Sequence, residues 1–319
     1  MERLSTAPVS DHRSSNGRVV GTVPAGEASR GRLVEMMVGH QVAAEEPPAK
    51  GVDGASRLVV KDLRVESDRG AEAVRGISFE VHSGELVGIA GVAGNGQREL
   101  AEAIAGLRPP VSGSIRLNDT ELAGRGPAAI RSAGLGYVPE ERMRDGVVAD
   151  FSVAENLLLV DYGSRAFCRF GFLRTRAIRR HCQELVVAFN VKTPSLETPV
   201  RSLSGGNIQK LIMARELSGR PEVLLVAQPT RGIDVSASMY IHQRLVAQRE
   251  SGTATVIISE DLDEVMTFSD RVLVMYEGTI IGSADPRTAT REEIGMMMAG
   301  VRPEAPVPDG EPDSRSVMP

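Results

Sequence analysis

The chain has 319 residues, of which 41% are hydrophobic and 25% are charged, so it can bury a core and wholesale disorder is excluded. Lys and Arg number 37 against 42 for Asp and Glu, and the net charge of −5 argues against a protein that coats nucleic acid. Trp is absent and aromatic residues amount to 3%, which argues against a surface that stacks bases or sugars.

The N-terminal part of the chain repeats a segment near its C-terminal end. Residues 16–39 align without gaps on residues 277–300 with seven identical positions, and both copies open with G-x-x-x-G and close with M-M-x-G. We interpret residues 1–40 as the C-terminal remnant of a preceding domain of the same type, and a coincidental strand–helix piece is the alternative. Residues 41–56, rich in Glu, Pro, Gly and Ala, predict a linker.

Short strands alternate with helices from residue 57 onward. Ile77, Phe79 and Val81 alternate as in a half-buried strand. A buried strand is expected at residues 86–90, and further strands at residues 223–227, 255–259 and 271–276. A helix is predicted from the spacing of Leu100, Ala103, Ile104 and Leu107. This alternation predicts an α/β fold with a mainly parallel sheet.

A glycine-rich loop lies between the strand at 86–90 and the helix that follows it. The glycine spacing is that of a phosphate-binding loop, G-x-x-x-x-G-K-[ST], in which backbone amides wrap phosphates at a helix N-terminus. Gln97 stands where Lys would reach the β- and γ-phosphates, and Arg98 stands where Ser or Thr would ligate Mg²⁺, which a guanidinium cannot do. A plain glycine turn is the alternative. The candidate nucleotide-binding residues of this degenerate loop are Gly91, Gly94, Asn95, Gly96, Gln97 and Arg98.

A second motif, Leu-Ser-Gly-Gly-Asn-Ile-Gln-Lys at residues 203–210, opens another predicted helix. A serine hydroxyl and glycine amides at the positive end of a helix suit a γ-phosphate. The motif resembles the LSGGQ signature of ABC-type ATPases, in the LSGGNxQK form of sugar and nucleoside importers. The resemblance implies half of an ATP site, completed by a facing domain, with four candidate residues here: Ser204, Gly205, Gly206 and Asn207.

Residues 223–234 resemble the Walker B strand and D-loop of the same family. Ala227 replaces the aspartate that organises Mg²⁺ in that family. Gln228 replaces the glutamate that would activate the attacking water, and an amide cannot take a proton. Asp234 of the D-loop is kept, and the resemblance places it in the ATP site shared with the facing domain.

Two further positions depart from the family pattern. Glu140 stands at the Q-loop glutamine, and Glu260 stands at the switch histidine that would contact the γ-phosphate. A carboxylate at such a position repels phosphate. The family's adenine-stacking aromatic residue is also missing between Arg57 and Ser78. The groups that the family uses for hydrolysis are therefore replaced, so no catalytic residue is expected in this chain's own site.

The resemblance covers residues 57–300, and its nearest form is the second nucleotide-binding domain of the tandem ATPase subunit in importers of nucleosides or simple sugars. It implies a RecA-like P-loop core with a mainly parallel sheet and a helical subdomain inserted at about residues 141–201. Residues 301–319 contain five prolines and few apolar side chains, so we expect a disordered tail.

The pattern of kept and replaced residues implies a composite ATP site. A catalytically intact partner domain would supply most of the Mg²⁺ ligands, and this chain alone would be inactive. The family further implies membrane permease subunits as partners, an extracytoplasmic substrate-binding protein as an indirect one, no nucleic acid, and a peripheral position on the cytoplasmic face of the membrane. The alternative is an inactive fragment of a truncated or split tandem gene.

Several other sequence features do not by themselves indicate a functional site. The five histidines show no metal-ligand spacing, so no metal site is expected from them. The cysteines form no C-x-x-C pair, which favours a reducing compartment. Residues 165–180 hold six arginines, three phenylalanines and no acid. The default interpretation of this run is a solvated helical face, and docking to a permease or to lipid headgroups is the alternative.

Overall fold

The computed structural model describes residues 14–15, 18–19 and 54–302. The expected remnant of a preceding domain, most of the expected linker and the proline-rich tail therefore fall outside the described residues, apart from two short strands. The first long strand begins at Ser56, the last residue of the expected linker.

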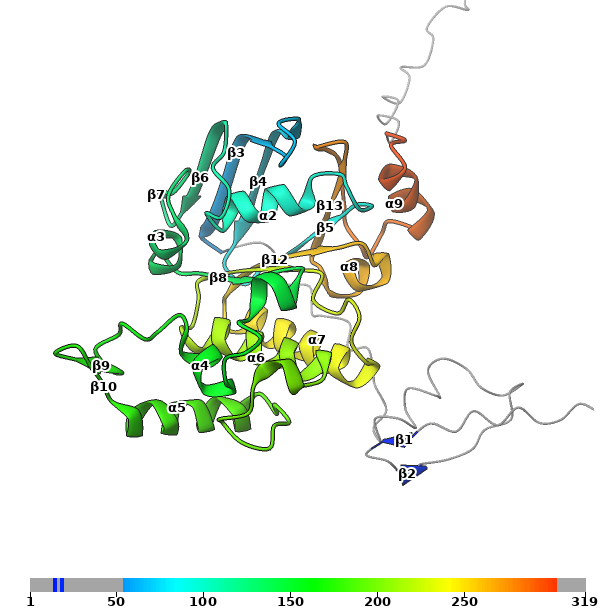
Figure 1. Cartoon of the computed structure of the whole chain (residues 1–319). Coiled ribbons are helices and arrows are strands. Elements are labelled where there is room, and N and C mark those ends of the chain that lie inside the picture. The colour runs from blue at the N-terminus through cyan, green and yellow to red at the C-terminus, as the bar shows by residue number, and fades with distance from the viewer. Residues whose placement is uncertain (1–13, 16–17, 20–53, 303–319) are drawn as a thin grey trace, which may run out of the picture.

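Two sheets and a set of helices make up the described part of the chain (Figure 1). The strands are β1 (Ser14–Ser15), β2 (Arg18–Val19), β3 (Ser56–Glu66), β4 (Glu72–His82), β5 (Leu86–Ala90), β6 (Ser112–Leu117), β7 (Thr120–Glu121), β8 (Leu135–Val138), β9 (Cys168–Arg169), β10 (Phe172–Leu173), β11 (Val223–Ala227), β12 (Ala254–Ser259), β13 (Arg271–Tyr276) and β14 (Thr279–Ala284). The helices are α2 (Gln97–Ile104), α3 (Pro127–Ser132), α4 (Val153–Leu158), α5 (Thr175–Ala188), α6 (Gly205–Ser218), α7 (Val235–Glu250), α8 (Leu262–Phe268) and α9 (Arg291–Met298), with a π-helical turn at Arg142–Gly146 and a 3-10 turn at Val200–Ser202.

The larger sheet has six strands in the order β14-β13-β5-β12-β11-β8, all parallel except β14 at one edge. Every residue of β5, β11 and β12 is buried, because both faces of this sheet are covered. The predicted α/β fold with a mainly parallel sheet is confirmed. The carboxyl ends of these strands meet at one edge of the sheet, which is where the motif loops begin.

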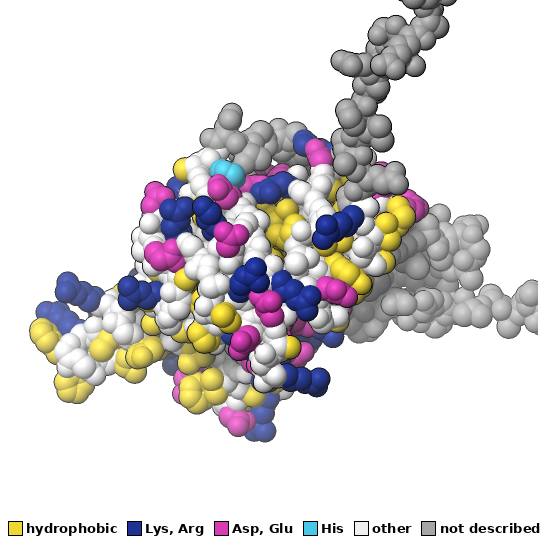
Figure 2. Space-filling view, turned by 90° about the horizontal axis from the view of Figure 1, so that it is seen from above, with side chains coloured by type: hydrophobic (Ala, Val, Ile, Leu, Met, Phe, Trp, Pro, Cys, Tyr) yellow, Lys and Arg dark blue, Asp and Glu magenta, His cyan; other side chains and the backbone are white. Residues whose placement is uncertain are grey.

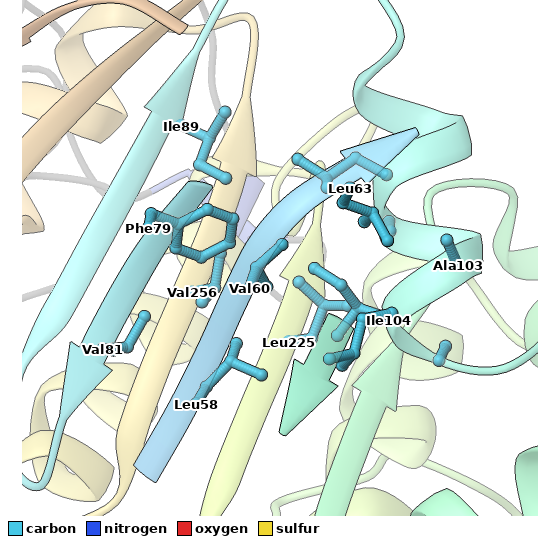
Figure 3. Packing of buried hydrophobic residues seen from close by; sticks show 14 of the residues in the cluster. Leu58, Val60, Leu63, Phe79, Val81, Ile89, Ala103, Ile104, Leu225 and Val256 are labelled. Atoms are coloured by element: carbon cyan, nitrogen blue, oxygen red, sulfur yellow. The ribbon is translucent and has the colours of Figure 1, made fainter. Parts of the chain in front are cut away.

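The smaller sheet is antiparallel, in the order β4-β3-β6-β7, and α2 packs between it and the parallel sheet (Figures 1 and 3). Leu58 and Phe79 of the antiparallel sheet, Ile104 of α2, and Leu225 and Val256 of the parallel sheet belong to one buried cluster. Burial of these side chains fixes α2, and with it the glycine loop that precedes α2, against the edge of the sheet.

The opposite face of the parallel sheet is covered by α6 and α7, and α4 and α5 pack on α6; these four helices share a second buried cluster (Figure 1). Residues 141–201 contain α4 and α5 as well as the β9–β10 hairpin. The arginine run at residues 165–180, expected on a helical face, therefore lies partly on a hairpin. None of the helices among the described residues is long and apolar enough to cross a membrane.

One expectation for α2 is wrong. The helix ends at Ile104, and Gly106 follows in the left-handed conformation at φ 73°. A glycine in this conformation ends a helix after its C-cap, so the 3.6-residue period does not continue to Leu107. The Leu107 side chain is 55% exposed, whereas Ile104 is fully buried.

Matched truncations of these two residues test the packing of α2. We expect Ile104→Ala to lower the free energy of unfolding by about 2–5 kcal/mol, because a fully buried side chain leaves a cavity. Leu107→Ala is expected to change it by less than about 1 kcal/mol, as is usual at exposed sites. Urea denaturation of the two variants and the parent chain checks the difference, and equal losses would contradict the assignment of the α2 boundary.

Candidate functional site

A hollow of about 280 Å³ opens at the carboxyl edge of the parallel sheet. Four motifs that are far apart in the sequence contribute to its lining: the glycine loop, the segment after β8, the end of β11 and the segment after β12. The sequence-predicted residues in this lining are Gly94, Gly96, Gln97, Arg98, Glu140, Ala227, Gln228 and Glu260. The structure thus brings the degenerate positions together in one place.

The glycine loop has a backbone that other residues could not adopt. Gly94 and Gly96 have φ angles of 87° and 96°, and a Cβ on Gly96 would lie 2.2 Å from the carbonyl oxygen of Ala73. Asn95 anchors the loop, because its Oδ1 accepts a hydrogen bond of 2.9 Å from the backbone amide of Glu277. The amides in the first turn of α2 have no acceptor within the helix and are available to an anion.

Gln97 occupies the position of the phosphate-binding lysine. Its side chain is buried, and its Nε2 has no hydrogen-bond partner among the described residues. A Cβ on Gly91 would lie 2.5 Å from this Nε2, so the amide lies against the bend of the loop. An unpartnered buried amide is costly unless a ligand oxygen accepts its proton. Gln97 can therefore serve a phosphate as a neutral donor and cannot neutralise its charge.

Arg98 lines the hollow, and its guanidinium bonds to a carboxylate of the same helix. Its Nε donates to Oε1 of Glu102 at 2.7 Å, one turn further along α2. A guanidinium has no acceptor atom, and the side chain of Ala227 offers only a methyl group at the end of β11. The two positions that would supply oxygen ligands therefore supply none, and the residues present do not fit Mg²⁺ at this loop.

Two acidic side chains, Glu140 and Glu260, also line the hollow. Burial raises the pKa of Glu140 above its usual value; the neighbouring Arg231 lowers it and the charge of Glu260 raises it further. Arg231 forms an ion pair with Glu140. The backbone amide of Glu260 donates to Oε1 of Gln228 at 3.3 Å, so Gln228 contacts the switch segment. The carboxylates of Glu140 and Glu260 therefore add negative charge to the hollow, which opposes the binding of a phosphate.

The signature residues form a second cluster. Ser204 caps α6 and is exposed, and its Oγ accepts hydrogen bonds from the backbone amide of Asn207 at 3.4 Å and from the side-chain Nδ2 of Asn207 at 2.9 Å. Both of these bonds are accepted by the hydroxyl oxygen, which leaves the hydroxyl proton free to be donated to a ligand. The positive end of α6 lies behind it.

The D-loop packs directly on the signature. A Cβ on Gly206 would lie 2.7 Å from the Cβ of Ala237 and 3.0 Å from Oδ2 of Asp234, so only glycine fits. Asp234 caps α7, accepting from the Ala237 amide at 2.9 Å, and a hydrogen bond from Ser236 lowers the pKa of Asp234. All five sequence-predicted residues of the shared ATP site lie in this cluster or beside it.

Sequence reasoning missed the residues that join the two clusters. Nη1 and Nη2 of Arg142 donate to the carbonyl oxygens of Arg231 and Gly232, at 2.6 Å and 2.9 Å. A Cβ on Gly205 would lie 3.2 Å from Arg142 Nη2. Since the Arg231 side chain pairs with Glu140, the segment at 231–232 contacts both the hollow and the signature. The only sequence signal was an arginine inside each motif.

A buried carboxylate, Glu264, was also missed. It accepts hydrogen bonds from the hydroxyl groups of Ser259, at 2.5 Å, and Thr230, at 2.7 Å. His242 Nε2 lies 2.7 Å from its Oε1. Glu264 therefore connects the end of β12, the segment after β11 and helix α7, which are the elements that carry the switch position and the D-loop.

Comparison with known proteins identifies what this arrangement resembles. The family model described as "ABC transporter" matches residues 74–231. The chain is 39% identical over 284 residues to the guanosine import ATP-binding protein NupO of Bacillus subtilis, and 42% identical over 284 residues to the nucleoside import ATP-binding protein NupA of Lactococcus lactis. It is 40% identical to the ribose import ATP-binding protein RbsA 1 of Rubrobacter xylanophilus. In each case 89% of the chain is covered but only 56% of the relative, so the chain spans little more than half of their length.

Solved structures agree on the fold. A nucleotide-free ATP-binding cassette from an ABC transporter matches with a TM-score of 0.62 and 19% identity, over 77% of this chain and 96% of that one. The dimeric bacterial ABC transporter cassette MJ0796 matches with a TM-score of 0.62 and 20% identity, over 73% of this chain and all of that one. The predicted ABC ATPase fold is confirmed.

Loss of the Arg142 contacts tests how firmly the D-loop is held. We expect Arg142→Ala to speed amide hydrogen exchange of residues 230–234 at least about tenfold, because two charged hydrogen bonds to the backbone are lost. Arg144→Ala is the control, since the Arg144 side chain bonds to Asp145 beside it and, among the described residues, makes no bond to the D-loop. Exchange followed by mass spectrometry measures both variants, and equal protection in the two would show that Arg142 does not hold the loop.

Proposed function

We propose, from the match to the ABC transporter family model over residues 74–231, that the chain contains an ATP-binding domain of this family and is the energy-coupling ATP-binding subunit of an importer for nucleosides or simple sugars. The relatives that support this proposal are named for import of guanosine, nucleosides, glucose and ribose. The single observation that carries it is the match of 89% of the chain to import ATP-binding proteins at 39–42% identity.

We further propose that residues 57–300 are the second ATP-binding domain of a tandem subunit, with residues 1–40 as the tail of the first and 41–56 as the linker. The relatives are close to twice the length of the matched region, which supports the tandem arrangement. In the second copy of the internal repeat, residues 277–300 form strand β14 and helix α9, which are terminal elements of the described domain.

ATP is hydrolysed at a site composed of two domains. The Ser204 hydroxyl and the amides at the start of α6 contact a γ-phosphate held on the partner's phosphate-binding loop, and Asp234 keeps the D-loop packed on the signature. Ligands mainly from the partner would hold Mg²⁺, which would supply neutralisation of the phosphate charge. The partner also supplies the base, since Gln228 and Ala227 cannot activate a water.

The chain's own hollow holds nucleotide weakly, statically or not at all. The first-turn amides of α2 and the free Nε2 of Gln97 support contact with phosphate oxygens. The carboxylates of Glu140 and Glu260 oppose it, and replacing the lysine removes a charged hydrogen bond worth about 1.5–3 kcal/mol.

Membrane permease subunits are the proposed docking partners. A groove of about 560 Å³ lies between the core and the inserted subdomain, lined by α3, by β8 and by residues 159–164. The exposed Leu107, which does not pack in the core with α2, lies in the lining of this groove and would contact the permease there. Tyr137 lines both the groove and the nucleotide hollow, which supports coupling between them. In this proposal the chain lies at the cytoplasmic face of the membrane, and a substrate-binding protein acts on it only through the permease.

Restoring the replaced residues tests whether they are what keeps the chain inactive. The purified parent chain is expected to show no Mg²⁺-dependent ATP hydrolysis. A variant with six substitutions is expected to hydrolyse ATP at least about a hundredfold faster, since a positioned base alone contributes ~10²–10⁴-fold. The substitutions are Gln97→Lys, Arg98→Thr, Glu140→Gln, Ala227→Asp, Gln228→Glu and Glu260→His.

The matched control adds Ser204→Arg to the restored variant. It is expected to bind Mg-ATP and to lose hydrolysis. The reason is that the arginine of one copy takes the place of the signature hydroxyl that would contact the γ-phosphate bound to the facing copy. Phosphate release, measured after rigorous removal of contaminating ATPases, reports all three proteins. Hydrolysis by the parent chain, or an unaffected Ser204→Arg control, would contradict the proposed division between the two half-sites.

A further inference from the structure

The hairpin of β9 and β10 has an unusual turn. Phe172 pairs with Arg169 and Leu173 pairs with Cys168, which leaves Phe170 and Gly171 as a two-residue loop. Their φ angles are 53° and 81°, as in a type I′ turn, which normally holds Asn, Asp or Gly at its first position. A bulky residue with positive φ is strained. The tip of this hairpin therefore carries an aromatic side chain at a position that folding does not favour.

Packing within the described residues does not explain the apolar tip either. Phe170 is 86% exposed, Phe172 is 79% exposed and Leu173 is 53% exposed. Phe167, at the base of the hairpin, is by contrast buried and lies 4.9 Å from the His181 ring, centroid to centroid. The base is fixed to the inserted subdomain, while the tip projects from it (Figure 1).

Positive charge surrounds the exposed aromatic residues. Arg179 and Arg180 form ion pairs with Glu197 and Glu184. The remaining arginines of the run form no ion pair with another described residue, and the Arg169 guanidinium lies 5.2 Å from the centre of the Phe170 ring. Figure 2 shows hydrophobic and basic side chains together at the left end of the molecule, where Figure 1 places the hairpin. We define the basic hairpin surface as Arg165, Arg169, Phe170, Phe172, Leu173, Arg174 and Arg176.

We propose that the basic hairpin surface binds anionic lipid headgroups, with its phenylalanines in the interfacial region of the bilayer and its arginines on lipid phosphates. Exposed aromatic and leucine side chains flanked by arginine are the combination that a membrane interface stabilises. The chain as a whole has a net charge of −5, so a negatively charged surface would attract it only where positive charge is concentrated.

The shape of the surface favours lipid over a protein partner. A two-residue turn on a projecting hairpin is convex and narrow, and it offers little area to a folded partner, whereas a bilayer interface deforms around it. The hairpin also lies close to the groove proposed for the permease, because residues 159–164 line that groove and β9 begins at Cys168. Lipid contact and permease docking can therefore occur on the same side of the molecule. The lipid proposal does not depend on which nucleotide site is active.

Vesicle flotation of the full chain tests the proposal. We expect binding to vesicles that mix phosphatidylcholine with phosphatidylglycerol, little binding to phosphatidylcholine alone, and release when NaCl is raised to about 0.5 M, where charges are screened. The double substitution Arg169→Gln with Arg176→Gln is expected to weaken binding about thirtyfold, at roughly fivefold per arginine near an anionic surface. Phe170→Ser with Phe172→Ser is expected to weaken it about tenfold.

The control carries the same loss of charge at a distance from the hairpin. Arg116 and Arg125 are exposed on or beside the antiparallel sheet, and their replacement by Gln is expected to leave lipid binding unchanged. All the replaced side chains are exposed, and thermal unfolding checks that every variant keeps the parent's midpoint. Binding that does not depend on anionic lipid, or that survives the hairpin substitutions, overturns the proposal. The proposal is also overturned if the hairpin variants keep their binding to lipid but no longer bind the permease, because that result would assign the surface to a protein partner.

Discussion

The need to offset the negative charge of phosphate is the physical constraint that separates the two motif clusters of this structure. Helix N-termini offer hydrogen-bond donors to phosphate oxygens without the cost of burying a cation, and two of the described helices, α2 and α6, begin at the glycine loop and at the signature. The side chains around the two ends differ. Glu140 and Glu260 line the hollow at α2, whereas an exposed Ser204 hydroxyl stands at α6. This difference in charge is the physical basis of the asymmetric site that we propose.

The two helix ends are linked by short polar contacts. Arg142 bonds to the backbone of residues 231 and 232, Arg231 pairs with Glu140, and Glu264 joins the switch strand to the D-loop. The D-loop is therefore held from the side of the hollow and from the side of the signature. A chain that had lost its function would be free to lose these contacts, but glycine still occupies position 206, where a Cβ would meet Ala237.

The sequence predicts local features of this molecule well and long-range ones poorly. The strands at 223–227 and 271–276 were predicted to the residue, because continuous apolar runs between turn signals are typical of buried parallel strands. The hollow could be anticipated because each motif follows a strand of the sheet. The Arg142 contacts could not be anticipated, since they join residues about 90 positions apart. The end of α2 was also not anticipated, because the hydrophobic spacing continues to Leu107 although Gly106 ends the helix before it. The hairpin within the arginine run could not be predicted, because the composition of residues 165–180 is equally compatible with a helix.

Vanadate trapping in the assembled pair of ATP-binding domains tests the central claim most directly. Vanadate takes the place of the γ-phosphate after hydrolysis and, under ultraviolet light, cleaves the backbone beside it. The account predicts a cut in this chain at residues 203–207, in the signature, and a cut in the partner at its own phosphate-binding loop. Cleavage of this chain at residues 91–98 would place hydrolysis at its own glycine loop and would contradict the account.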